Sequence, residues 1–250
     1  MIFLLLSALL CGCAAGDPKN RSELPAQTES AARSNAAEPE ETKASEEKEM
    51  KKTIRVLFIG NSYTYCNDLP SIFQTMCVEK GITAFVDSVT AGGYTLAHFV
   101  SETNEYGIKA RGLLKSKKYD YVVLQEQSVR PASNPETFYK SLRELLPLIA
   151  ENGATPVLYE TWGRADGSET LASNGWTHEE MQEKLREAYE TAAEEYGTLL
   201  ALAGERFHKA YRGGEEVFAQ DGSHPSPLGS RICAQAIFET IAEHAGFGAE

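Results

Sequence analysis

Two short segments at opposite ends of the chain contain the side chains that nucleophilic catalysis requires. Ser62 directly follows Gly60 and Asn61, while Asp221 and His224 lie three residues apart near the carboxyl end. A serine attacks a carbonyl group when an imidazole takes its proton, and a carboxylate orients that imidazole. We therefore treat Ser62 as the candidate nucleophile, His224 as the candidate general base and Asp221 as its orienting acid.

Each segment also has an ordinary structural interpretation. Asn61 and Ser62 are good N-cap residues, so they are equally suited to begin a helix. A phosphate-binding loop is disfavoured, because neither G-x-G-x-x-G nor G-x-x-x-x-G-K-[ST] occurs there. A solitary histidine commonly lies at the surface or hydrogen-bonds in the core. That explanation suffices for the remaining histidines, which are His98, His178, His208 and His244. It suits His224 poorly, because the D-x-x-H-P spacing lets an acid and an imidazole lie on one side of a turn.

The rest of the folded region must bring these two segments together. From residue 53 onward, short β-branched runs alternate with helical patterns, as in a parallel sheet covered on both faces. Strands are predicted at residues 54–59, 83–89, 119–126, 155–161 and 198–202. Helices are predicted at residues 69–80, 135–152, 178–196 and 228–245. The sequence therefore predicts one doubly wound, flavodoxin-like α/β domain over residues 53–250, with a five-stranded parallel sheet between helices. In such sheets, reactive groups lie at the carboxyl ends of the strands.

Composition limits the classes of function. The 250 residues, 42% hydrophobic and 24% charged, are enough for one sizeable core but few for two full domains. The net charge of −12 disfavours nucleic acid or an anionic membrane surface as a partner. The five cysteines contain no C-x-x-C pair and no histidine at ligand spacing. We expect no metal site and no cofactor, and at most one disulfide among Cys66, Cys77 and Cys233.

The amino-terminal segment resembles a lipoprotein leader. Residues 2–10 are apolar but too short to cross a bilayer, which is typical of a signal-peptide core. They run into Leu10-Cys11-Gly12-Cys13, which is similar to the bacterial lipobox. Residues 1–13 are thus expected to be a signal peptide with Cys13 as the lipid-bearing residue. The alternatives are an ordinary signal peptide or a buried strand.

Residues 14–52 are rich in Ala, Glu, Ser, Lys and Pro and contain no aromatic residue. They predict a disordered acidic linker, with a solvated helix at residues 36–52 as the alternative. The expected location is the bacterial cell envelope, facing outside the cytoplasm. The lipid anchor would be the only contact with the membrane.

Taken together, the two chemical segments resemble the first and last sequence blocks of the SGNH (GDSL-like) hydrolase superfamily, over residues 53–247. Gly60-Asn61-Ser62 corresponds to the G-D-S or G-N-S block, and Asp221 to His224 corresponds to D-x-x-H. The resemblance implies a serine esterase with a Ser-His-Asp triad. It also implies an oxyanion hole that includes the backbone N–H groups of Ser62 and Gly93, although Gly92-Gly93 alone would suit a simple turn.

The third block departs from the family pattern. Family members end the third strand in G-x-N-D, whose Asn donates to the oxyanion, whereas residues 124–130 read L-Q-E-Q-S-V-R. A Gln amide offers the same donor, so Gln127, or in second place Gln125, is expected to replace the Asn. Strand alternation would direct these two side chains to one face and Glu126 to the other. Q-E-Q-S at this place resembles a poorly characterised bacterial branch of the superfamily.

The long polar connection after the fourth strand is the candidate specificity loop. Trp162 would provide an aromatic wall for a sugar ring beside Arg164 and Asp166, or else it covers an edge of the core. Asn61 and Tyr63, which flank the nucleophile, are further candidate substrate contacts. The hypothesis is hydrolysis of short acyl esters, in particular O-acetyl groups on carbohydrate, through an acyl-enzyme. The alternatives are a lipase or thioesterase on the same fold, or an inactive surface carbohydrate-binding protein.

Overall fold

Five parallel strands form the sheet that positions the candidate site. The computed structural model describes residues 52–247. The strands are β1 (Thr53–Gly60), β2 (Thr83–Thr90), β3 (Tyr121–Leu124), β4 (Thr155–Tyr159) and β5 (Leu199–Ala201). Their order across the sheet is β2-β1-β3-β4-β5, so the winding reverses between β1 and β3. Ligands of such sheets bind beyond the carboxyl ends of the strands at this switch point. The predicted flavodoxin-like α/β architecture is confirmed.

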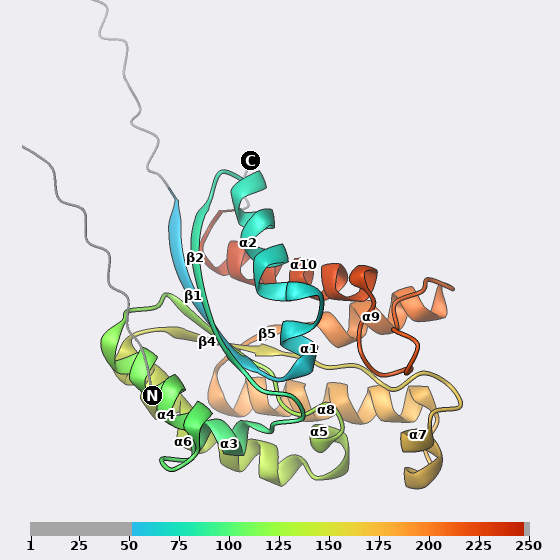
Figure 1. Cartoon of the computed structure of the whole chain (residues 1–250). Helices are drawn as coiled ribbons and strands as arrows, with labels where there is room; N and C mark the ends of the chain where they lie inside the picture. Colours follow the sequence, from blue (N-terminus) through green and yellow to red (C-terminus); the bar gives the residue numbers. More distant parts are fainter. Residues whose placement is uncertain (1–51, 248–250) are drawn as a thin grey trace, which may run out of the picture. The chain divides into compact units, whose positions relative to one another are not determined.

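Helices cover both faces of the sheet (Figure 1). The helices are α1 (Ser62–Tyr65), α2 (Leu69–Glu79), α3 (Leu96–Val100), α4 (Glu105–Ser116), α5 (Arg130–Ser133), α6 (Pro135–Asn152), α7 (Glu169–Asn174), α8 (His178–Tyr196), α9 (Ala203–Arg212) and α10 (Pro227–His244), and a short 3-10 turn, η1 (Cys66–Asp68), follows α1. Figure 1 shows α2, α9 and α10 on one side of the sheet and α3, α4 and α6 on the other.

Alternation along the strands explains the two cores. In β1, Val56 and Phe58 belong to the buried cluster on the side of α2 and α10, while Leu57 and Ile59 belong to the cluster on the other side. All four side chains are fully buried. A stretch of strand with both faces buried must be apolar at every position, which is why residues 56–59 of β1 form a continuous hydrophobic run, whereas Arg55 before them is exposed.

Helix bounds agree with the sequence better than strand ends do. Helices α6 and α8 begin and end where the sequence predicts them, and α8 starts with a capping box between Thr177 and Glu180. In contrast, β3 is only four residues long and ends at Leu124, so the chain leaves the sheet before the Q-E-Q-S segment. Helix α9 was not predicted.

The leader, the cysteines, membrane-spanning helices and metal sites were also the subject of sequence expectations. Cys13, the signal peptide and residues 14–51 of the linker lie outside the described residues. The three cysteines within residues 52–247 are free thiols. None of the helices in this range is long and apolar enough to cross a membrane. The same range contains no group of three or more His, Cys, Asp or Glu side chains placed to hold a metal ion.

Candidate active site

Ser62, His224 and Asp221 form one hydrogen-bonded chain at the carboxyl edge of the sheet. The distance from Ser62 Oγ to His224 Nε2 is 2.8 Å, and that from His224 Nδ1 to Asp221 Oδ2 is 2.5 Å. The other carboxylate oxygen, Oδ1, accepts hydrogen bonds from the backbone N–H groups of Ser223 (3.0 Å) and His224 (2.9 Å). With Nδ1 donating to the carboxylate, Nε2 is left to accept the serine proton.

The Asp221 carboxyl remains ionised at neutral pH. Burial acts to raise its pKa, but the hydrogen bonds from the His224 ring and from two backbone N–H groups outweigh it and lower the pKa to about 2. A carboxylate in this position orients the ring and stabilises the imidazolium that forms when His224 takes a proton.

The turn that presents Ser62 is held by the side chain of Gln125. Its Oε1 accepts hydrogen bonds from the backbone N–H of Asn61 and from the hydroxyl of Thr64, both at 2.9 Å. Only glycine fits at position 60, because a Cβ atom there would lie 2.4 Å from Thr64 Oγ1 and 2.7 Å from Gln125 Oε1. The G-N-S turn therefore depends on close approach to a residue beyond the end of β3.

Asn61 also holds this turn. Its side chain caps α1 by accepting from the backbone N–H of Tyr63 at 3.1 Å, and its Nδ2 donates to the carbonyl of Tyr94 at 2.9 Å. The side chain is buried, although the residue lines the cavity in front of Ser62. Asn61 therefore caps α1, as its ordinary structural interpretation predicts, and the same side chain holds the turn that carries Ser62.

Gln125 is not available as an oxyanion donor, which corrects the second-place assignment. The residue is fully buried, and its Nε2 donates to the carbonyl of Glu126. The expected alternation failed because β3 ends at Leu124, so Gln125 and Gln127 are not successive residues of one strand face.

Gln127 faces the cavity in front of Ser62, which has a volume of about 330 Å³. Its Oε1 accepts from the backbone N–H groups of Val129 (3.0 Å) and Arg130 (3.1 Å), and its Nε2 makes one long hydrogen bond, of 3.5 Å, to Ser128 Oγ. An amide nitrogen has two N–H groups, so one of them remains available. Gly93, in the left-handed region at φ +73°, also lines the cavity. Among the described residues, the backbone N–H groups of Ser62 and Gly93 have no hydrogen-bond partner. These two N–H groups and the second N–H of the Gln127 amide are therefore available near the nucleophile, and their action on an oxyanion stays a prediction.

Glu126 joins the two segments that supply these donors, a role the sequence interpretation missed. Its carboxyl accepts from the backbone N–H of Gln127 at 2.6 Å and from that of Leu96, the first residue of α3, at 3.2 Å. Burial raises the pKa of Glu126 to about 7, against the opposing effect of these hydrogen bonds. The available signal was an acidic residue in the polar segment that directly follows the buried strand β3.

Trp162 belongs to the core, which corrects its assignment as a sugar-binding wall. Its ring is fully buried between Tyr63 and Phe207, with centroid distances of 4.3 and 4.2 Å. Its Nε1 donates to the carbonyl of Ser223 at 3.1 Å. Trp162 therefore supports the loop that carries His224, and its faces are closed to a ligand.

Arg164 and two tyrosines complete the cavity wall. Arg164 Nη2 donates to Ser128 Oγ at 2.8 Å, and Nη1 donates to the hydroxyl of Tyr63. Tyr63 is buried apart from its contribution to the wall, whereas Tyr65 is 47% exposed. Of the residues proposed for substrate contact, Asn61, Tyr63 and Arg164 line the cavity. Tyr65 also lines the cavity and is the aromatic side chain there that solvent can reach.

A doubly wound parallel sheet with a serine, a histidine and an aspartate joined at its carboxyl edge is the architecture of a serine hydrolase. A protein from Slackia heliotrinireducens, described as an SGNH hydrolase, is 33% identical to this chain. The match covers 76% of this chain and 100% of that one, with a TM-score of 0.69. The chain therefore belongs to the SGNH hydrolases.

Two less similar structures share the fold. A DUF4886 family protein from Bacteroides uniformis ATCC 8492 is 20% identical, with a TM-score of 0.62, over 77% of this chain and 84% of that one. The acetyl xylan esterase AlAXEase is 14% identical, with a TM-score of 0.56, over 75% of this chain and 100% of that one. No protein-family model and no curated protein matches the sequence.

Proposed function

We propose that this protein is a serine esterase that hydrolyses short acyl esters, with O-acetyl groups on carbohydrate as its substrates. The observation that carries the proposal is the hydrogen-bonded chain from Ser62 Oγ through His224 to Asp221. Membership of the SGNH hydrolases supports it. The proposal makes Ser62 the nucleophile, and the residues that hold its turn become positioning residues.

The reaction proceeds through an acyl-enzyme. His224 Nε2 takes the proton of Ser62 as its oxygen attacks the ester carbonyl, and the negative charge develops on the carbonyl oxygen. The N–H groups of Ser62 and Gly93 and the amide of Gln127 stabilise that oxyanion. The imidazolium returns its proton to the departing alcohol. A water molecule that His224 deprotonates then attacks the acyl-serine, which releases the acid and restores the hydroxyl of Ser62.

The cavity favours a short acyl group and a polar alcohol. It is small, at about 330 Å³, and contains the hydroxyls of Tyr63, Ser128 and Ser223 beside the nucleophile. The buried position of Trp162 removes the sugar-stacking argument made for that residue. Tyr65, exposed at the cavity, is the aromatic side chain that remains for this purpose. A lipase or thioesterase would require a longer apolar groove for its acyl chain.

Esters that differ only in acyl length test this proposal. Wild-type protein and Ser62→Ala are compared on p-nitrophenyl acetate, butyrate and octanoate, and on acetylated xylo-oligosaccharides. We expect wild-type kcat/KM to fall from acetate to octanoate and Ser62→Ala to show only background hydrolysis. Equal rates for the two proteins would contradict the esterase proposal and favour the inactive binding protein. A maximum at octanoate would favour the lipase or thioesterase.

We further propose that Cys13 carries a lipid that anchors the protein in the bacterial envelope. The lipobox-like segment that ends at Cys13 supports this. Labelled palmitate should be incorporated into the wild-type protein but not into Cys13→Ser. Incorporation that persists in Cys13→Ser would refute the assignment of this residue.

A further inference from the structure

The cavity in front of Ser62 contains a guanidinium group that no acidic side chain neutralises. Arg164 lines the cavity together with Ser62 and His224, and none of the described residues that line it is acidic. Arg164 also takes part in none of the ion pairs found within residues 52–247. In a chain of net charge −12, this positive group has no described carboxylate within ion-pair distance.

The groups that contact Arg164 are neutral hydroxyls. Its two terminal nitrogens donate to Tyr63 Oη and Ser128 Oγ, and its Nε is buried without a partner. Burial raises the pKa of Tyr63, although Arg164 and hydrogen bonds act to lower it, so the phenol keeps its proton. The positive charge is therefore solvated by dipoles but not cancelled.

These hydroxyls are arranged to donate toward a further group. A guanidinium has only donors, so the oxygens of Tyr63 and Ser128 accept from it, and their protons point elsewhere. Tyr63 Oη lies 3.0 Å from Ser223 Oγ, next to His224. One proton of the Tyr63–Ser223 pair is used between them, so the cluster presents one cation, the O–H of Ser128 and one further O–H. This set matches an anion with several acceptor sites.

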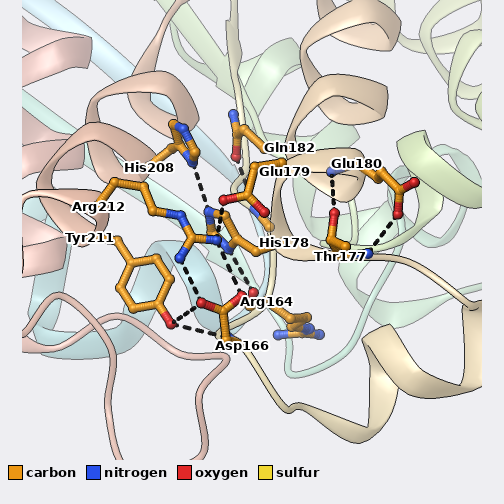
Figure 2. Close-up of polar contacts among 11 residues, drawn as sticks. Arg164, Asp166, Thr177, His178, Glu179, Glu180, Gln182, His208, Tyr211 and Arg212 are labelled. Atoms are coloured by element: carbon orange, nitrogen blue, oxygen red, sulfur yellow. Dashed lines mark hydrogen bonds and ion pairs between the residues drawn. The ribbon is translucent and has the colours of Figure 1, made fainter.

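A network of polar contacts with α8 and α9 holds the backbone of the loop that carries Arg164 (Figure 2). The carbonyl oxygen of Arg164 lies 2.7 Å from Nδ1 of His178, a fully buried residue whose Nε2 lies 2.8 Å from Nδ1 of His208. Two residues further on, Asp166 pairs with Arg212 at 2.6 Å. The backbone is thus held before a substrate arrives, which reduces the entropy lost when the guanidinium binds one.

We propose that Arg164 determines specificity by binding a carboxylate carried by the substrate ester. A partly buried guanidinium costs free energy of desolvation that a bidentate carboxylate offsets well. The inference rests on the proposed esterase function and narrows its substrate class to acidic esters, such as acetylated sugars that also bear a carboxyl group. The carboxylate belongs either to the alcohol part or to the acyl part of the ester.

Pairs of esters that differ in charge test the inference. For the alcohol part, 4-acetoxybenzoate is compared with its methyl ester; for the acyl part, monoethyl glutarate is compared with ethyl valerate. We expect wild-type kcat/KM to favour the charged member of one pair, and Arg164→Gln to reduce that charged-to-neutral ratio about 10- to 100-fold. Arg164→Lys should retain part of the preference. Arg186→Gln, which removes a guanidinium from the exposed face of α8, should leave the ratio unchanged.

A binding measurement separates this inference from the esterase proposal. Binding of 4-acetoxybenzoate and monoethyl glutarate to Ser62→Ala, followed by NMR, should be detected for at least one of them. It should weaken when Arg164→Gln is added. The inference is overturned if the charged-to-neutral ratio of kcat/KM is near one for both pairs in wild type, or if the preference survives in Arg164→Gln. Hydrolysis of the neutral esters would still support the esterase proposal in that case. If no ester is hydrolysed, the esterase proposal fails. The carboxylate site is overturned as well if the NMR measurement detects no binding, or if binding is the same with and without Arg164→Gln.

Discussion

The two loops that supply the catalytic groups are held in opposite ways. The hydrogen bonds of the Asp221 carboxylate all go to Ser223 and His224, within four residues of chain, and the longer-range contacts of this loop include those of His224 with Ser62 and of Ser223 with Trp162. The turn that carries Ser62 is held by Gln125, 64 positions from the Asn61 N–H that it accepts, and by the carbonyl of Tyr94, 33 positions from Asn61. The first arrangement is local and partly exposed, whereas the second is buried and depends on three strands.

This difference separates residues that act in the reaction from residues that build the site. Substitutions in the Asp221–His224 loop should reduce catalysis while the fold remains stable. Substitutions around the Ser62 turn should reduce stability and catalysis together. Activity and unfolding, measured on the same variants, distinguish the two groups.

The largest effect is expected for His224→Ala. Loss of the general base should lower kcat about 10⁴- to 10⁶-fold, because Ser62 then has no group to take its proton. The free energy of unfolding should change by only about 0.5 kcal/mol, as for a surface substitution. Steady-state kinetics and urea unfolding check the two statements. A large decrease in the free energy of unfolding would show that this loop also stabilises the fold.

Gln127→Ala should have the next largest effect. Removal of one oxyanion donor typically lowers kcat about 100- to 1,000-fold, with KM little changed. The substitution also removes the acceptor of the Val129 N–H, which is only part-buried, while the Arg130 N–H keeps the backbone carbonyl of Gln127 at 3.0 Å, so we expect a stability loss of about 1 kcal/mol. A kcat equal to that of wild type would remove Gln127 from the oxyanion hole and leave the family Asn without a substitute in this chain.

Gln125→Leu should affect both properties. It leaves the buried Asn61 N–H and the Thr64 hydroxyl without an acceptor, at about 1–3 kcal/mol each. A displaced Ser62 should also lower kcat, by about 100-fold for a shift near 1 Å. Thr64→Val is the matched control, because it removes only one of the two hydrogen bonds and should cost correspondingly less. Reduced activity at unchanged stability in Gln125→Leu would contradict a supporting role.

The smallest expected effect is the change of stability with pH that the buried acid Glu160 causes. Burial raises the pKa of Glu160 to about 8, from 4.5 in the unfolded chain, despite hydrogen bonding to the Glu205 N–H. Because the folded protein holds the Glu160 proton more tightly than the unfolded chain does, protonated Glu160 contributes its full stabilisation below pH 4.5. That stabilisation is lost as the pH rises from 4.5 to about 8. Asp221 behaves oppositely, since its lowered pKa stabilises the fold above pH 3.8 and is lost as the pH falls toward 2. The melting temperature should therefore fall from pH 5 to 8, and Glu160→Gln should flatten this slope. An unchanged slope would contradict the assignment to Glu160.

The same division explains how much the sequence could predict. The D-x-x-H loop and helices α6 and α8 depend on local patterns and were predicted from them. The end of β3 depends on pairing with β1 and β4, so the sequence assigned Gln125 and Gln127 to one face. Trp162 was misassigned because its partners, Tyr63 and Phe207, come from α1 and α9. The isolation of Arg164 from carboxylates is likewise a property of the fold that no local pattern records.

Covalent labelling shows whether Ser62 is the nucleophile. A phosphonate that reacts with activated serines should modify wild-type protein at one site, and mass spectrometry should locate the adduct on the peptide that contains Ser62. His224→Ala should prevent the labelling, because its serine is no longer activated. An adduct at another residue, or equal labelling of wild type and His224→Ala, would contradict the assignment of Ser62 as the nucleophile.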